Sequence, residues 1–144
     1  MSIVSFSFTK INVERKQDYS GRINVANNIS IKNIEQKNLP LGGSKQSSLR
    51  CTFEFITKYM AEDKKEVGSI LLEGDVIYLE ELAKIKKLLT DWEKERKLPK
   101  EMMTHILNTA LSKCNIHALT LSDSINMPPP MPLPRVQVNL ENKN

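Results

Sequence analysis

The sequence predicts an α+β fold in which strands come first and helices follow. Up to about residue 78, apolar and polar side chains alternate with a period of two, which is typical of strands half buried in a sheet. Beyond that point the apolar side chains recur every three or four residues, which is typical of amphipathic helices. The prolines between Pro128 and Pro134 then end the helical pattern, because proline cannot continue a helix. This order of elements predicts an α+β domain.

The length and composition favour one globular domain, which we assign to residues 1–144. The net charge of +4 is small, and Lys and Arg are interspersed with Asp and Glu, so nucleic acid is a disfavoured partner. No apolar run reaches the length of about 18 residues that a spanning helix needs, so we expect no membrane insertion. The first residues lack the pattern of a signal peptide, and the cytoplasm is the expected location.

Four strands are expected, at residues 2–14, 22–34, 48–60 and 66–78. The first alternates Val4, Phe6 and Phe8, and the alternation resumes at Ile11 after a slip of one residue. Such a slip indicates a β-bulge near residues 9 and 10. The second strand has Asn27 in its middle, and because asparagine is a poor strand residue we expect a bend or an edge position there.

The third strand has the clearest alternation. Phe53, Phe55 and Tyr59 share one side and polar residues occupy the other, the pattern of an antiparallel sheet with one covered face. The aromatic row fits the core face under the helices, and it also fits a partly open surface that binds other chains. The fourth strand has apolar residues on both sides, so we expect it to be central or covered on both faces. Gly74 indicates a bulge or close packing within it.

Two helices are expected, at residues 79–96 and 99–126. Pro99 suits the first position of a helix, where a backbone donor would be unpaired anyway. About 26 residues of the second helix would span about 39 Å at ~1.5 Å per residue, which exceeds the width of a four-stranded sheet at ~4.8 Å per strand. Its apolar stripe therefore calls for a second partner, and a copy of the same chain is the simplest one. The expected interface residues are Ile106, Ala110, Cys114, His117 and Leu121.

The proline-rich segment has two interpretations. Residues 127–140 can form a strap that returns the extended chain to the fold. Alternatively, Pro129 and Pro132 form a PxxP docking motif, followed by the basic Arg135. The basic residue falls one place beyond the commoner spacing, and the prolines directly follow the helix, so the strap is favoured.

No residue pattern predicts an enzyme. Cys114 and His117 are neighbours on the expected core face of a helix, which favours packing over nucleophilic catalysis. His105 and His117 are too far apart in one helix to share a metal ion. Gly42 and Gly43 lack the lysine and the following helix of a phosphate-binding loop. We therefore expect no cofactor and no metal.

The order of the elements resembles that of the SecB-like family of export chaperones, and most closely its archaeal members of unassigned role. The resemblance is carried by the aromatic third strand, the long helix and the ending LPK…ILNTALSKCNIHALTLSDSINMPPPMPLP, and it extends from about Val4 to Val138. It implies a four-stranded antiparallel sheet with helices packed on one face. It also implies assembly as a homodimer or homotetramer, and ATP-independent binding of unfolded polypeptide clients in apolar grooves.

The resemblance further implies which residues bind polypeptide. These are Phe53, Phe55, Tyr59, Tyr78, Leu82, Met127 and Met131. Classical bacterial members are strongly acidic whereas this chain is basic, so docking to an export motor does not carry over. Two hypotheses follow: a molecular chaperone for unfolded or partly folded chains, and an oligomeric adaptor or regulatory protein that binds one specific folded partner.

Overall fold

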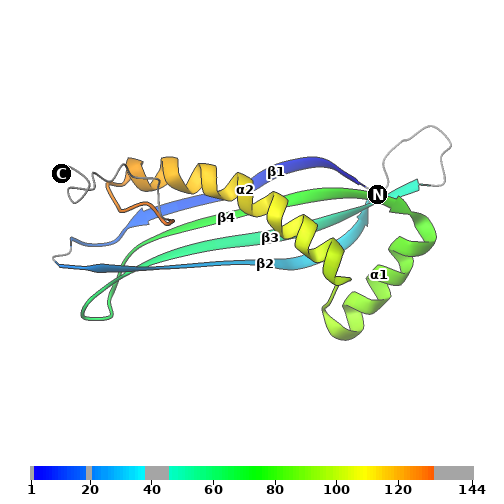
Figure 1. Cartoon of the computed structure of the whole chain (residues 1–144), viewed down its shortest axis with the longest axis horizontal. Coiled ribbons are helices and arrows are strands. Elements are labelled where there is room, and N and C mark those ends of the chain that lie inside the picture. The colour runs from blue at the N-terminus through cyan, green and yellow to red at the C-terminus, as the bar shows by residue number, and fades with distance from the viewer. Residues whose placement is uncertain (1, 19–20, 38–45, 132–144) are drawn as a thin grey trace, which may run out of the picture.

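A computed structural model describes residues 2–18, 21–37 and 46–131, and it has the predicted α+β fold (Figure 1). Four antiparallel strands are followed by two helices, which pack on one face of the sheet. The elements are β1 (Ser2–Arg15), β2 (Ile23–Lys37), β3 (Gln46–Ala61), β4 (Glu66–Glu81), α1 (Leu82–Glu95) and α2 (Lys100–Ser124). No helix in the described ranges is both long and apolar enough to cross a membrane.

The strands are arranged in the order β1-β4-β3-β2, so β3 and β4 are central and β1 and β2 form the edges. The central position of β4 explains its apolar residues on both sides, and the edge position of β2 explains why it tolerates Asn27. The register of β1 against β4 shifts between Phe8 and Lys10, which confirms the predicted bulge.

The inner face of the sheet, which the helices cover, is filled by aromatic side chains. Phe6 stacks on Phe53 with ring centroids 5.2 Å apart, and Phe8 meets both rings edge-on. Gly74 lies in register with Phe8 on one side and Phe53 on the other. A Cβ at Gly74 would lie 2.3 Å from the backbone oxygen of Ser7 and 2.8 Å from the Phe53 ring, so only glycine allows this close approach.

The opposite face of the sheet carries polar and charged side chains beside apolar ones of the central strands, such as Leu71 and Ile77 of β4. Lys32 pairs with Glu54 at 3.3 Å, Arg50 pairs with Glu35, and the Thr52 hydroxyl donates to Asp75 at 2.9 Å. These groups alternate along the strands with the buried inner residues, as expected of an antiparallel sheet with one wet face.

The first helix begins later than predicted. Leu79 and Glu80 belong to β4, because they pair with Ser48 and Ser47 of β3, and α1 begins at Leu82. The expected helix at 79–96 overran the strand because Leu79 lies three residues before Leu82, a helical spacing, and also alternates with Ile77 as in a strand. The helix ends at Glu95, where Arg96 adopts a left-handed conformation and donates its N–H to the Trp92 carbonyl.

The inference that α2 outruns its own sheet was wrong. Figure 1 shows α2 running obliquely along the length of the strands, not straight across them. The strands have 14 to 16 residues, roughly 45–55 Å at ~3.3 Å per residue. The 25 residues of α2 span about 38 Å. The helix contacts all four strands, so its length by itself does not require a second chain.

The buried side chains of α2 recur at every fourth residue: Met102, Ile106, Ala110, Cys114, Ala118 and Ser122. An α-helix turns by about 100° per residue, so this stripe rotates by about 40° at each step. A rotating stripe keeps contact with a sheet whose strands twist under the helix. The last four of these side chains are small, which lets the helix backbone lie close to the strands.

The position of this stripe predicts different effects for the same substitution at two sites on α2. Ile106→Ala should lower the free energy of unfolding by about 2–5 kcal/mol, because Ile106 is fully buried. Ile116→Ala should change it by less than about 0.5 kcal/mol, because Ile116 is 65% exposed. Chemical denaturation of both variants measures the difference. Equal losses would show that α2 does not present this face to the sheet.

Candidate functional site

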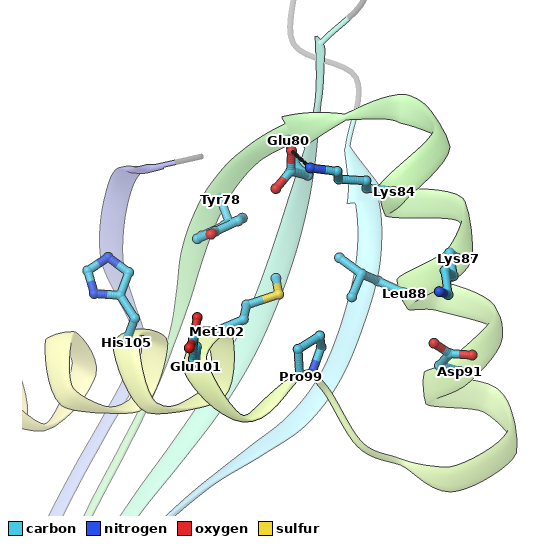
Figure 2. Close-up of a pocket in the computed structure, with 10 residues that line it drawn as sticks. All are labelled: Tyr78, Glu80, Lys84, Lys87, Leu88, Asp91, Pro99, Glu101, Met102 and His105. Atoms are coloured by element: carbon cyan, nitrogen blue, oxygen red, sulfur yellow. Dashed lines mark ion pairs between the residues drawn. The ribbon is translucent and has the colours of Figure 1, made fainter.

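A cavity of about 480 Å³ separates α1 from α2 at the end of the sheet where β4 passes into α1 (Figure 2). Its volume falls within the roughly 300–1,000 Å³ usual for ligand pockets. It is lined by Tyr78, Glu80, Lys84, Lys87, Leu88, Asp91, Pro99, Glu101, Met102 and His105. We call this cavity the interhelix groove.

The groove exists because the two helices are anchored separately on the sheet. Ile85, Leu88 and Trp92 of α1 are buried over one end of the sheet, while α2 starts beyond a short connection and turns away along the strands. That connection contains the buried Leu98 and then Pro99, whose extended backbone precedes the first turn of α2. The helices thus diverge, and the end of β4 forms the floor between them.

The floor of the groove is apolar. Figure 2 shows Tyr78 on β4, with Leu88 pointing in from α1 and Met102 pointing in from α2. All three are largely buried by the chain itself. A methionine adapts to varied apolar shapes and an aromatic ring offers a large apolar surface, which suits contact with side chains of differing form.

The rim of the groove carries both signs of charge. Lys84 pairs with Glu80 at 3.8 Å, and Glu80 also accepts the Glu81 backbone N–H at 3.0 Å. Lys87 and Asp91 lie on α1, and Glu101 lies on α2 (Figure 2). Because Lys84 is well exposed, its ion pair adds little to stability. A mixed rim of this kind does not select a strongly charged ligand.

The two cysteine thiols are poorly suited to nucleophilic chemistry. Burial raises the pKa of both Cys51 and Cys114 to about 12, so these thiols stay protonated. Burial also raises the pKa of Tyr78. Within residues 2–18, 21–37 and 46–131, no group of three His, Cys, Asp or Glu side chains could hold a metal ion.

The residues predicted to bind polypeptide are divided between the core and the surface. Phe53, Phe55 and Tyr59 are at most 1% exposed and form the core of the sheet's inner face. Tyr78 lies on the groove floor. Leu82, at the start of α1, is 37% exposed but does not line the groove.

The last two of the predicted binding residues lie elsewhere. Met127 is buried and Met131 half-buried, both in the segment that follows α2. That segment is described only to residue 131, so most of the predicted strap at 127–140 lies outside the described residues.

The predicted interface residues also face inward for the most part. Ile106, Ala110 and Cys114 are fully buried against the chain's own sheet, and Leu121 is half-buried. His117 is exposed and meets the Phe8 ring edge-on, with centroids 4.5 Å apart. A second copy could reach only the outer side of α2.

Sequence reasoning missed most of the groove. Leu88 and Met102 lie in apolar stripes at helical spacing, which do not show which side chains stay accessible, and His105 is considered in the sequence only as a metal ligand. The available signal was the connection at Leu98 and Pro99, which separates one helix from the next. The pattern gives no angle between them, so it could not show that a cavity opens there.

No protein-family model matches the chain, and no curated protein matches it. Among solved structures it is similar to the SecB-like chaperone Rv1957 of Mycobacterium tuberculosis, in complex with a ChAD peptide from the Rv1956 HigA1 antitoxin. The TM-score is 0.54 at 8% sequence identity, and the match covers 96% of this chain and 92% of that one. The likeness at this identity shows a shared SecB-like fold.

The burial of the two thiols predicts how the folded protein reacts. Cys51 and Cys114 should resist iodoacetamide at neutral pH and react only after unfolding, because the thiolate is the nucleophile. The contribution of the two thiols to stability should be constant below about pH 9, the pKa of an ordinary thiol, and should fall as the pH rises toward about 12, because in that range only the unfolded chain ionises its thiols. Mass spectrometry of labelled protein with and without denaturant measures the labelling, and chemical denaturation between pH 8 and pH 11 measures the stability. Rapid labelling of folded protein would contradict it.

Proposed function

We propose that this protein binds apolar segments of unfolded or partly folded polypeptides in the interhelix groove, without ATP, as a SecB-like molecular chaperone. The observation that carries the proposal is the open cavity with an apolar floor of Tyr78, Leu88 and Met102. An apolar side chain that enters it leaves water, which contributes about 1.5–3 kcal/mol when burial is complete.

The chemistry of the groove supports a binding role that is tolerant of sequence. Its floor offers shape and apolar area with few fixed hydrogen-bond partners, and its rim offers Lys84 and Lys87 beside Asp91 and Glu101. Such a site gains affinity from burial and not from the recognition of one polar pattern. The likeness in fold to a SecB-like chaperone that is seen with a peptide adds support.

The alternative function is an adaptor or regulatory protein that binds one specific partner. It is favoured by the observation that the structural neighbour is seen with a peptide from one antitoxin. The two functions differ in breadth, because a chaperone binds many unrelated unfolded sequences and an adaptor binds one. A panel of unrelated unfolded peptides therefore separates them.

We also propose that the chain forms a homodimer or homotetramer and acts without a cofactor or a catalytic step. Because the predicted interface side chains are largely buried, assembly would use exposed apolar residues such as Val4 and Ile11 on β1. Sedimentation analysis tests this, and a monomer at all concentrations would rule it out.

Two neighbouring methionines of α2 provide a matched test of the groove. Met102→Ser should weaken binding of an unfolded model client about tenfold, because it removes apolar floor that a client side chain would cover. Met103→Ser should leave affinity within about twofold, because Met103 does not line the groove. Fluorescence anisotropy with a labelled, permanently unfolded client measures both variants, and thermal unfolding checks that each is folded.

The proposal also requires that the wild-type protein suppress aggregation of a chemically denatured client without nucleotide. Equal affinity of the Met102→Ser and Met103→Ser variants, when both are folded, would place the binding site elsewhere. Failure to bind any member of a peptide panel would remove the chaperone function.

A further inference from the structure

The segment that follows α2 is held on the sheet by hydrogen bonds and by a buried side chain, at a place distinct from the interhelix groove. We call residues Met127–Met131 the proline strap. In Figure 1 the chain turns back at the end of α2, where it is drawn in orange. Asn126 makes this turn with a left-handed backbone, and the Met127 N–H donates to the Ser122 carbonyl at 2.9 Å.

The backbone of the proline strap presents carbonyl acceptors almost exclusively. Pro128, Pro129 and Pro130 have no N–H to donate, and each proline holds the residue before it in an extended conformation. Extended prolines repeat every three residues in the polyproline II helix. The burial follows this repeat, since Met127 and Pro130 are buried while Pro129 is exposed.

Side chains from three strands of the sheet donate hydrogen bonds to carbonyls in and next to the proline strap. The Tyr59 hydroxyl of β3 donates to the Pro128 carbonyl at 2.7 Å, and the Asn27 amide of β2 donates to the Pro130 carbonyl at 2.6 Å. The Arg15 guanidinium of β1 donates to the carbonyls of residues 125 and 126 at 3.3 Å. The buried Thr57 hydroxyl donates to Asn27 at 2.7 Å, which fixes the amide so that its N–H groups point at the strap.

The apolar part of this surface is shaped around one side chain. A Cβ at Gly68 would lie 3.1 Å from the Met127 terminal methyl and 3.5 Å from the Tyr59 ring. The absent side chain at Gly68 thus leaves a place for Met127 beside Tyr59. We call the surface made by Arg15, Asn27, Tyr59 and Gly68 the strap site.

We propose that the strap site is a binding site for proline-rich, extended peptides, and that the chain's own proline strap is its resident, competing occupant. An aromatic ring with a polar tip and an amide donor beside it recognises a donor-poor polyproline II segment through its carbonyls. The ligand class is a peptide with an apolar anchor three residues before a proline, the spacing of Met127 and Pro130. A ligand in trans must displace the strap, so its apparent affinity falls by the fraction of molecules in which the strap is released.

The test is binding of a fluorescent peptide with the sequence of residues 125–131 to full-length protein, followed by anisotropy. Pro129→Gly should tighten binding about threefold, because the exposed ring contributes no packing while glycine favours the released strap through its greater conformational freedom. Met127→Ser should tighten binding tenfold or more, because it removes the buried anchor of the resident strap. Adding Tyr59→Phe to Met127→Ser should weaken binding severalfold, because the resident strap is already released in Met127→Ser and the bound peptide then loses the donor to its Pro128 carbonyl.

Two controls make the outcome decisive. A peptide with alanine in place of its three prolines should bind at least tenfold more weakly, and Met102→Ser should leave binding of the proline peptide unchanged, because Met102 belongs to the interhelix groove. Folded Pro129→Gly protein that binds no more tightly than wild type would overturn the proposal, as would equal binding of the alanine peptide. Loss of binding in Met102→Ser would also overturn it, by placing the peptide in the groove.

Discussion

The packing of α2 along the inner face of the sheet is the interaction on which both candidate sites depend. Its buried residues recur at every fourth position, so the contact rotates around the helix and follows the twist of the strands. Small side chains from Ala110 to Ser122 bring the helix close to the sheet over more than half of its length. Large side chains at Met102 and Ile106 fill the space near its start.

The course of α2 positions the two sites at its opposite ends. Near its first turn the helix diverges from α1, and the interhelix groove opens above Tyr78 at the end of β4. After its last turn the chain reverses at Asn126, and Met127 therefore lies at the other end of the inner face, beside Gly68. The sites differ in what they can recognise. The groove offers apolar area under a charged rim, whereas the strap site offers donors directed at backbone carbonyls.

The sequence predicted the fold well because strand periodicity and glycine placement are local signals. The bulge after Phe8, the central position of β4 and the close packing at Gly74 follow directly from which residues alternate. The start of α1 was misplaced because Leu79 and Glu80 fit a strand and a helix equally well, and only pairing with β3 decides between them. Local patterns do not record such long-range pairing.

The sites were predicted less well, because they depend on directions that periodicity does not contain. The helical period predicts the length of α2 but not its angle to the strands. The predicted length was compared with the width of the sheet, which suggested uncovered apolar surface, but the oblique course of α2 lets the strands cover it. The alternating pattern from Phe53 to Tyr59 does not show whether the aromatic row is exposed or buried. In the structure the row is buried under the helices. The groove arises from the divergence of α1 and α2, a property of two elements together.

The proline strap combines firm placement with easy release. Burial of Met127 contributes about 1.5–3 kcal/mol, and the hydrogen bonds from Tyr59 and Asn27 about 0.5–1.5 kcal/mol each. Ordering five ordinary residues would cost about 1–2 kcal/mol apiece, but three of these five are prolines, whose restricted backbone lowers that cost. The free energy gained from burial and hydrogen bonding therefore differs from the entropic cost of ordering the strap by only a few kcal/mol. A strap so near balance covers Tyr59 and Gly68 in the free protein, yet a ligand of the same chemistry needs only a modest advantage to take its place.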